Sequence, residues 1–287
     1  MTTGEHEPGT RRPDRELLDE LGIRPSKALG QNFLHDPKIV RRIADAADLG
    51  PTDLVVEVGP GLGVLTAELA RRAKRVVTVE LDRRLAAYLR ASFTDPPVEV
   101  CEADILEVDA GELIGRDDYK IVANLPYSIA AAAIEHLLEA GHPPTQLTVM
   151  VQREVAERIV ARPPDMSVLA VAVQFFGRPR IVLRIGPGAF FPPPKVDSAV
   201  IRVDVDPSRP LTGNRRAAFF RLVRGGFSQR RKRLGNALAA ALGSPKPDVE
   251  ERLRRAGVDP DRRAETLTVD DWLAVERELG ALAGAAA

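Results

Sequence analysis

Short apolar segments alternate with stretches of helical periodicity along most of the chain. An apolar run of a few residues that is bounded by Gly, Pro or Asp is typical of a strand buried on both faces of a sheet. Such runs predict strands over residues 54–58, 75–80, 98–101, 119–124, 147–151, 180–185 and 198–205. Because helical patterns separate most of these runs, the predicted fold is α/β, with a mostly parallel sheet and right-handed crossovers.

The pattern changes near Leu211, after which no further strand is expected. Apolar residues at helical spacing there predict short helices over residues 215–225, 230–242, 248–256 and 269–279. We therefore predict a flexible tail with a short helix over residues 1–25, an α/β domain over residues 26–206, and a small all-helical domain over residues 207–287.

The charge of the chain is unevenly distributed. The net charge is zero, with 41 basic and 41 acidic residues, which at first argues against a nucleic-acid partner. From Pro207 to Pro247, however, there are ten Lys or Arg and no Asp or Glu, so the remaining residues hold 31 basic against 41 acidic side chains. The sequence thus predicts a cationic segment on an otherwise acidic protein.

Cysteine content and hydropathy indicate the compartment. A single cysteine, Cys101, excludes an intramolecular disulfide and a cysteine metal cluster, which fits a reducing cytosol. The four histidines are scattered and suggest no metal site. No run approaches the roughly 18 apolar residues of a membrane span, and the first residues lack an apolar signal core, so we expect a cytoplasmic protein without a membrane anchor.

The segment Leu54–Gly63, LVVEVGPGLG, places three glycines directly after a predicted strand. Glycine adopts positive φ without strain and lets a ligand touch the backbone, so Gly59, Gly61 and Gly63 can form the floor of a ligand site. Spaced glycines alone fit a simple helix-start turn equally well, and a dinucleotide fingerprint would need a small residue where Val64 stands. The pattern, with an acid two residues before it, is similar to the S-adenosylmethionine loop of Rossmann-like class I methyltransferases.

Four residues suited to a ligand site lie at the ends of four successive predicted strands: Gly59, Glu80, Asp104 and Asn124. The ligands of parallel α/β sheets bind at the carboxyl ends of the strands, and an acid placed as Glu80 is can hold ribose hydroxyls. We expect these residues to share one site.

Asn124-Leu125-Pro126-Tyr127 carries the most informative chemistry. The exocyclic amine of adenine is a poor nucleophile because its lone pair is delocalised into the ring, and acceptors around its N–H bonds favour the form that attacks a methyl sulfonium. The Asn124 side chain and the Leu125 backbone carbonyl can be those acceptors, Pro126 fixes the turn, and Tyr127 offers a stacking face. Catalysis then rests on positioning and electrostatics, without a strong general base. Taken alone, the tetrapeptide also fits a structural turn.

Taken together, the motifs resemble the ribosomal RNA adenine N6-dimethyltransferases, most closely the bacterial small-subunit (16S) type. The resemblance extends from about Leu29 to Trp272, where the family's motifs occur in order as LGQNFLHD, VVEVGPGLGVLT, VVTVELD, EADIL, ANLPYSI, FFPPPKVDSAV, FSQRRKRLGNAL and RAETLTVDDW. One departure is residues 161–171, ARPPDMSVLAV, which lack the family's usual Tyr-Gly pair. That difference leaves the loop contacts near the target open.

The resemblance implies that S-adenosyl-L-methionine is the cofactor of the domain spanning residues 26–206. The implied cofactor-binding residues are Asn32 and Leu34 over the methionine end, Gly59 and Gly61 beneath it, Glu80 on the ribose, Asp104 on the adenine amino group and Asn124 beside the transferred methyl.

The resemblance also implies how the target base is held. Phe190, which matches the family's F-x-P-P-P, would stack on the base opposite Tyr127, although the neighbouring Phe191 could be the ring that faces the pocket. A base gripped in this way must leave its helix or loop, so base flipping or a single-stranded target is implied.

The implied substrate is ribosomal RNA. The reaction would be N6,N6-dimethylation of two adjacent adenosines near the 3′ end of 16S rRNA, as a step in ribosome biogenesis, carried out by a monomer on the small subunit. The basic segment would bind the RNA through Arg230, Arg231, Lys232 and Arg233, because the absence of acids favours phosphate contacts over a merely solvated helix face.

Three other functions compete with this interpretation. The related large-subunit (23S) enzymes that confer macrolide resistance share NLPY, but the QRRK and RAETL segments favour the small-subunit type. An assembly factor that acts mainly by binding would use the same fold. A DNA adenine methyltransferase would more often carry Asp-Pro-Pro-Tyr in place of residues 124–127.

Overall fold

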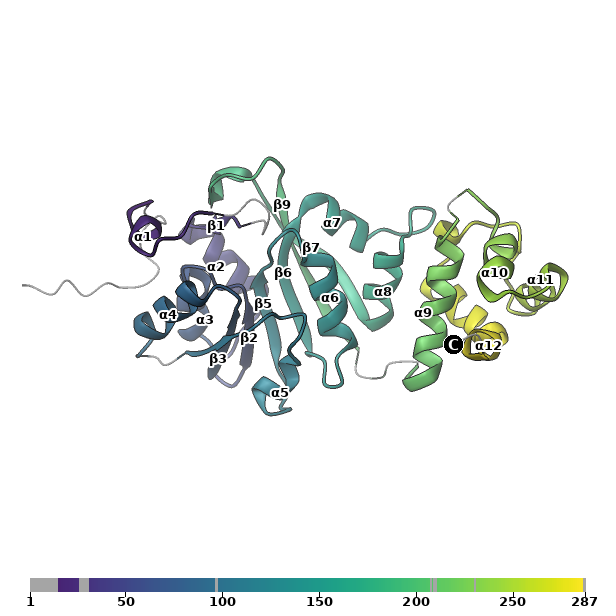
Figure 1. Ribbon diagram of the computed structural model, residues 1–287, viewed down its shortest axis with the longest axis horizontal. Helices are drawn as coiled ribbons and strands as arrows, with labels where there is room; N and C mark the ends of the chain where they lie inside the picture. Colours follow the sequence, from purple (N-terminus) through teal and green to yellow (C-terminus); the bar gives the residue numbers. More distant parts are fainter. Residues whose placement is uncertain are drawn as a thin grey trace, which may run out of the picture. The chain divides into compact units, whose positions relative to one another are not determined.

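The computed structural model describes residues 15–25, 31–95, 98–206, 208, 211–229 and 231–285. These residues form two compact units. The α/β unit comprises Met1–Ala156 and Arg178–Val205, and the helical unit comprises Glu157–Gly177 and Asp206–Ala287 (Figure 1). None of the helices in the described parts of the chain is both long and apolar enough to span a bilayer.

A seven-stranded sheet forms the centre of the α/β unit, in the order β4-β3-β2-β5-β6-β9-β7. The neighbouring strands β4, β3, β2, β5 and β6 are parallel to one another, and β9 pairs antiparallel with β6. The bounds are β2 Leu54–Val58, β3 Arg75–Glu80, β4 Glu99–Glu102, β5 Lys120–Asn124, β6 Gln146–Gln152, β7 Gly177–Ile185 and β9 Ser198–Val205. The predicted mostly parallel α/β sheet is confirmed.

The helices of the α/β unit begin where the sequence offers caps. The side chains of Asp36 and Asp82 accept hydrogen bonds from backbone N–H groups two residues further on, at 2.8 and 2.9 Å, and so satisfy donors at the starts of α2 and α4. Helix α5 was not predicted, because it is too short to show a helical period. The bounds are α1 Arg15–Glu20, α2 Pro37–Ala46, α3 Val64–Ala70, α4 Arg83–Ser92, α5 Ala110–Ile114 and α6 Ala130–Glu139. Helix α7 (Arg153–Ile159) begins in this unit and ends in the helical unit.

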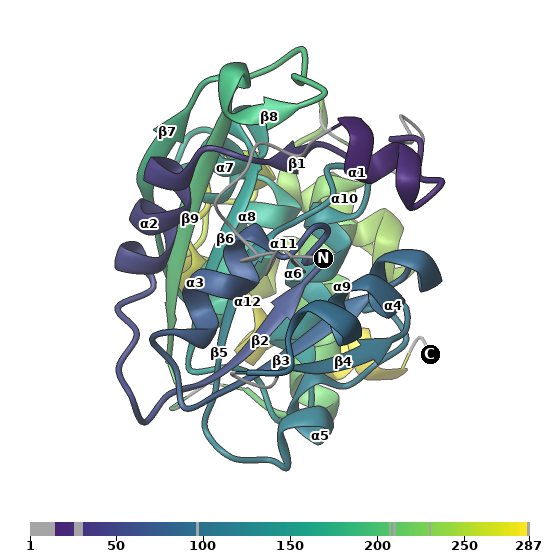
Figure 2. The same ribbon diagram turned by 90° about the vertical axis from the view of Figure 1, so that its left-hand side faces the viewer.

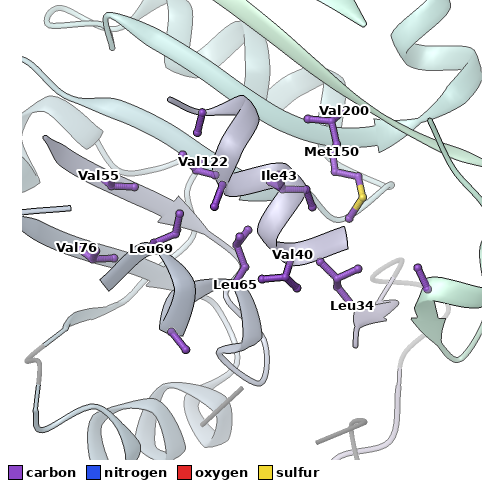
Figure 3. Close-up of a cluster of buried hydrophobic side chains, with 14 of the residues drawn as sticks. Leu34, Val40, Ile43, Val55, Leu65, Leu69, Val76, Val122, Met150 and Val200 are labelled. Atoms are coloured by element: carbon purple, nitrogen blue, oxygen red, sulfur yellow. The ribbon is translucent and has the colours of Figure 1, made fainter. Parts of the chain in front are cut away.

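A hydrophobic cluster fills the space between the sheet and the helices α2 and α3 (Figure 3). The apolar faces of these two helices lie over alternate residues of the strands, since successive strand residues point to opposite faces. The labelled members of the cluster are Leu34, Val40, Ile43, Val55, Leu65, Leu69, Val76, Val122, Met150 and Val200. The cluster packs Val55 of β2 against Leu65 and Leu69 of α3, the two elements that flank the glycine loop.

Two short strands that the sequence did not predict pair antiparallel next to the sheet: β1 (Phe33–Leu34) and β8 (Phe190–Phe191). Phe33 lies opposite Phe191, and Leu34 lies opposite Phe190. The strands lie near each other in Figure 2. Their pairing joins the QNFL segment to the proline-rich loop that precedes β9.

The helical unit is built on aromatic packing. The Phe175 ring of α8 (Val168–Phe176) lies 4.6 Å from the Phe219 ring of α9 (Gly213–Phe227), measured between centroids. Trp272 of α12 (Val269–Ala285) is fully buried and stacks on Phe227 at 6.0 Å. Helices α10 (Leu234–Leu242) and α11 (Lys246–Arg255) also belong to this unit.

The division of the chain differs from the predicted boundary at one segment. Residues 157–177 were assigned to the domain spanning residues 26–206, but they group with the helical unit. The reason is α8, whose residues are almost all buried and whose Phe175 and Phe176 pack against aromatic rings of α9. An apolar segment without a polar face gives no indication of which core it enters.

Candidate active site

The carboxyl ends of four neighbouring strands form the edge at which the predicted site lies. Strands β4, β3, β2 and β5 are adjacent in that order, and they carry Asp104, Glu80, Gly59 and Asn124 at or just beyond their ends. The prediction that these four residues follow successive strands is therefore confirmed, and the sheet order makes the strands neighbours.

The glycine loop adopts the backbone conformation that its composition predicts. Gly59, Gly61 and Gly63 have φ values of 63°, 59° and 78°, in the left-handed region that favours glycine. A Cβ atom on Gly61 would lie 3.1 Å from the Phe33 ring, and one on Gly63 would lie 2.6 Å from the Phe93 ring. The loop therefore needs glycine for space as well as for φ.

Glu80 is tied to this loop by hydrogen bonds. Its Oε2 accepts from the Gly61 N–H at 3.2 Å, and its Oε1 accepts from the Asp82 N–H at 2.9 Å. The side chain is buried, and burial raises its pKa, although the two backbone donors oppose the rise. A carboxylate held in this way has a fixed orientation.

A cavity with about 690 Å³ of empty space, part of it open to solvent, lies over the glycine loop. The cavity brings together most of the predicted site residues. Its lining includes Asn32, Leu34, Glu57, Gly59, Gly61, Glu80, Asn124, Leu125, Pro126 and Tyr127.

Asp104 is the predicted cofactor residue that does not line this cavity. It follows β4 as expected, but its Oδ1 accepts a hydrogen bond from the Leu106 N–H at 2.9 Å and so orders its own turn. Strand β4 is at one edge of the sheet, one place further from Gly59 than β3. Asp104 therefore lies beside the Glu80 end of the site.

Asn124 and Leu125 are positioned by the neighbouring backbone. The Asn124 Nδ2 donates to the Asn32 carbonyl at 3.3 Å, which leaves its Oδ1 as an acceptor for another group. The Leu125 N–H donates to the Met150 carbonyl of β6 at 3.2 Å. The motif is thereby held between the QNFL segment and the centre of the sheet.

Tyr127 forms one wall of the cavity, and its far end is anchored. Its hydroxyl lies 2.6 Å from the Ser198 hydroxyl at the start of β9. Burial raises the pKa of Tyr127, so the phenol stays neutral at physiological pH. The ring is available to the cavity, while its hydroxyl is engaged on the side of β9.

Glu57 is a cavity residue to which the sequence assigned no role of its own. It lies in β2, it is almost fully buried, and burial raises its pKa to about 8, with the Glu80 carboxylate adding to the rise. Its Oε2 has no hydrogen-bond partner among the described residues. The available signal was an acid inside an otherwise apolar strand, two residues before Gly59.

The structure does not place Phe190 as predicted. The side chain is 2% exposed and belongs to the hydrophobic cluster that contains Leu34, so it presents no free ring opposite Tyr127. Phe191 is half-buried against a second cluster that contains Phe33, and it does not line the cavity either. Because adjacent strand residues point to opposite faces, the pairing of β8 with β1 sends the two rings into two different cores.

The basic segment is less uniformly cationic in space than in sequence. Arg231, Lys232 and Arg233 are exposed ahead of α10, but the Arg233 Nη1 lies 2.7 Å from Asp261 Oδ1. The Arg215 Nη2 likewise lies 2.5 Å from the buried Glu276. The helix predicted from residue 230 begins at Leu234, and Arg230 lies outside the described residues.

Comparisons with known proteins show the family to which the chain belongs. The family model described as "Ribosomal RNA adenine dimethylase" matches residues 23–280. The chain is 46% identical to Ribosomal RNA small subunit methyltransferase A of Dehalococcoides mccartyi over 260 residues, which cover 90% of this chain and 89% of the relative. It is 42% identical to the protein of the same name from Clostridium perfringens over 262 residues, covering 90% of this chain and 92% of the relative.

Two solved structures are similar along nearly their whole length. The 23S rRNA methyltransferase ErmE has a TM-score of 0.69 at 31% identity, covering 86% of this chain and 99% of its own. A dimethyladenosine transferase from Plasmodium falciparum has a TM-score of 0.76 at 26% identity, covering 87% of this chain and 98% of its own. The family that the motifs predicted is thus confirmed: the chain belongs to the ribosomal RNA adenine dimethylases, which are methyltransferase enzymes.

Proposed function

We propose that this protein transfers methyl groups from S-adenosylmethionine to N6 of adenine in small-subunit ribosomal RNA, twice on each of two adjacent adenosines near the 3′ end. The observation that carries the proposal is the cavity in which the glycine loop, Glu80 and the corner Asn124–Tyr127 meet. The relatives named small-subunit methyltransferase A are 42–46% identical to the chain, against 31% for the 23S enzyme, which favours the small subunit.

The residues of the cavity fit S-adenosylmethionine. The backbone N–H of Gly61 and the carboxylate of Glu80 form a polar end suited to a ribose, and the unpartnered Glu57 Oε2 offers a further polar atom to the ligand. Asn32 and Leu34, on the segment paired with β8, would cover the ligand from above. When bound, S-adenosylmethionine supplies an electrophilic methyl group on a sulfonium.

The corner at residues 124–127 would hold the target amine. With its Nδ2 donating to Asn32, Asn124 would accept an N–H bond of the amine through Oδ1, and the Leu125 carbonyl would accept the other. Tyr127 would stack on the base. These contacts localise the nitrogen lone pair for attack, and the N-methylated adenine cation then loses its proton to water or to a nearby acceptor.

The two units would have different roles. The α/β unit would carry out catalysis, and the helical unit would bind the phosphate backbone of rRNA through Arg230, Arg231, Lys232 and Arg233. The protein would act as a monomer in the cytoplasm, where it meets the small ribosomal subunit during maturation.

The deciding experiment is methyl transfer to ribosomal subunits from a strain without this modification. Purified protein and labelled S-adenosylmethionine are incubated separately with small and with large subunits, and the modified adenosines are identified by mass spectrometry. We expect N6,N6-dimethyladenosine at two adjacent positions in small-subunit RNA. Dimethylation of large-subunit RNA alone would support the macrolide-resistance activity, and no transfer to either subunit would refute the proposed reaction.

A further inference from the structure

The hydroxyl groups of Tyr127 and Ser198 form a hydrogen bond between residues far apart in the sequence. The two oxygen atoms lie 2.6 Å apart, within the usual range for a hydrogen bond between hydroxyls. Ser198 is 0% exposed and does not line the cavity. A buried hydroxyl needs a hydrogen-bond partner, and here the partner is Tyr127, which forms one wall of the candidate active site.

Ser198 is itself held rigidly. It is the first residue of β9 and pairs with Gln152 at the end of β6. Directly before it, the Arg153 N–H donates to the Asp197 carbonyl at 2.9 Å, and the Arg153 Nη1 lies 2.6 Å from Asp197 Oδ2. The backbone that carries the Ser198 hydroxyl is therefore a fixed point at the carboxyl edge of the sheet.

Asn124 belongs to the same rigid frame. It lies opposite Met150 in the β5–β6 pair, and Met150 lies opposite Val200 in the β6–β9 pair. Since residues two apart on a strand share a face, Asn124 and Ser198 lie on the same face of the sheet, on either side of β6. The Tyr127 side chain joins the loop after Asn124 to this second fixed point.

A tyrosine that is attached only through its backbone can rotate about two side-chain torsions. Pro126 restricts the backbone before Tyr127, and the Ile129 N–H donates to the Pro126 carbonyl at 3.1 Å, so the Cα end is fixed. The bond to Ser198 fixes the opposite end. With both ends held, the plane of the ring is set relative to the Asn124 amide.

We propose that Ser198 is a positioning residue for methyl transfer: it sets the plane of the Tyr127 ring so that a base stacked on it presents its amine to Asn124. The inference rests on the proposed function. It predicts that loss of the Ser198 hydroxyl slows the chemical step and leaves the binding of S-adenosylmethionine and of the small subunit unchanged.

The test measures single-turnover methyl transfer at saturating small subunits, together with the KM for small subunits, donor affinity by calorimetry, and the melting temperature. Removal of one hydrogen bond should lower the rate of Ser198→Ala on the order of tenfold. Ser198→Thr keeps the hydroxyl and should retain the rate. Thr148→Val is the matched control, because it removes a different buried hydroxyl on β6, the strand next to β9. That hydroxyl accepts a hydrogen bond from the Gln146 Nε2 at 2.9 Å.

A double-mutant cycle separates positioning from general destabilisation. Tyr127→Phe keeps the ring but removes the same hydrogen bond, so we expect it to match Ser198→Ala, and the double variant to be no slower than either single variant. Three results would overturn the inference. The rate losses of the two single variants could multiply in the double variant, the rate of Ser198→Ala could equal that of wild type, or Thr148→Val could lose as much rate as Ser198→Ala. If the wild-type protein methylates no rRNA, the proposed function fails instead, which is a separate result.

Discussion

The backbone N–H of Gly61 donates to the carboxylate of Glu80, nineteen residues further along the chain, at 3.2 Å. This bond joins the glycine loop to the end of the neighbouring strand and fixes the orientation of the acid before any ligand arrives. It thereby prepares one carboxylate oxygen to lie at the polar end of the cavity.

The first prediction concerns this acid. Glu80→Gln should weaken the binding of S-adenosylmethionine by roughly 10- to 100-fold, because a hydrogen bond to a charged group contributes about 1.5–3 kcal/mol. Calorimetry measures the change. Glu99→Gln is the control, since it alters an exposed carboxylate of the same sheet that pairs with Arg75. Equal affinities for wild type and Glu80→Gln would contradict the role assigned to Glu80.

The second prediction concerns pH and stability. The pKa of Glu57 is raised from 4.5 to about 8 by burial, so this residue stabilises the folded state fully below pH 4.5, and that contribution is lost as pH rises towards 8. The difference in unfolding free energy between wild type and Glu57→Gln should therefore change by about 1.4 kcal/mol per pH unit within this window, in favour of the variant at high pH.

Denaturant unfolding at several pH values measures this difference. Groups that do not interact with Glu57 contribute equally to both proteins and cancel, whereas the interactions of Glu57 with Glu80 and Thr66 are part of the measured difference. A difference that does not vary with pH between 4.5 and 8 would mean that Glu57 ionises normally in the folded protein.

The third prediction concerns Asn124. Asn124→Ala should lower the rate of methyl transfer by about 100- to 1,000-fold, as expected for loss of a preorganised group at the reacting atoms. The fold should persist, because the backbone bond from Leu125 to Met150 is untouched. Single-turnover assays measure the effect, and Asn214→Ala, on an exposed turn of α9, serves as the control. Retention of full activity would remove Asn124 from the mechanism.

The fourth prediction concerns the basic segment. Arg231→Ala and Lys232→Ala should each weaken rRNA binding and reduce its salt dependence, by a slope of about 0.7–0.9 per lost phosphate contact. Arg233→Ala should have a smaller effect, because Asp261 already pairs with Arg233. Filter binding across a salt series gives both quantities, with Arg255→Ala, which pairs with Glu251, as the control. Donor affinity should not change in any of these variants.

The fifth prediction separates the strain of a left-handed backbone from steric crowding by an added Cβ. It compares Gly115, at the end of α5, with Gly63 of the glycine loop. At Gly115, with φ of 86°, an added Cβ meets nothing within 4 Å, so Gly115→Ala should cost only the left-handed strain of about 1–2 kcal/mol. At Gly63 an added Cβ would lie 2.6 Å from Phe93, so Gly63→Ala should cost more and weaken donor binding as well. Thermal unfolding measures the loss of stability in each variant. Equal losses would show that the glycine loop adjusts to accommodate the added Cβ.

Much of the fold follows from local patterns. The strand that ends at Val58, the glycines after it and the acid at the end of β3 could be located because burial, positive φ and strand-end chemistry each leave a short-range signature. The family's motifs likewise identified the corner at residues 124–127. These features depend on residues close together in the chain, and the sequence alone determined them.

Contacts between distant segments were decided only by the tertiary structure. Pairing of β1 with β8 buried Phe190 in a core, against the prediction that it would face a base, because register decides which face a residue occupies. Asp261 partly neutralises a segment that contains no acid of its own, and α8 joined the helical unit through Phe175. Hydrogen bonds and packing depend on distance in space, and residues remote in sequence give no local sign of which partner they will meet.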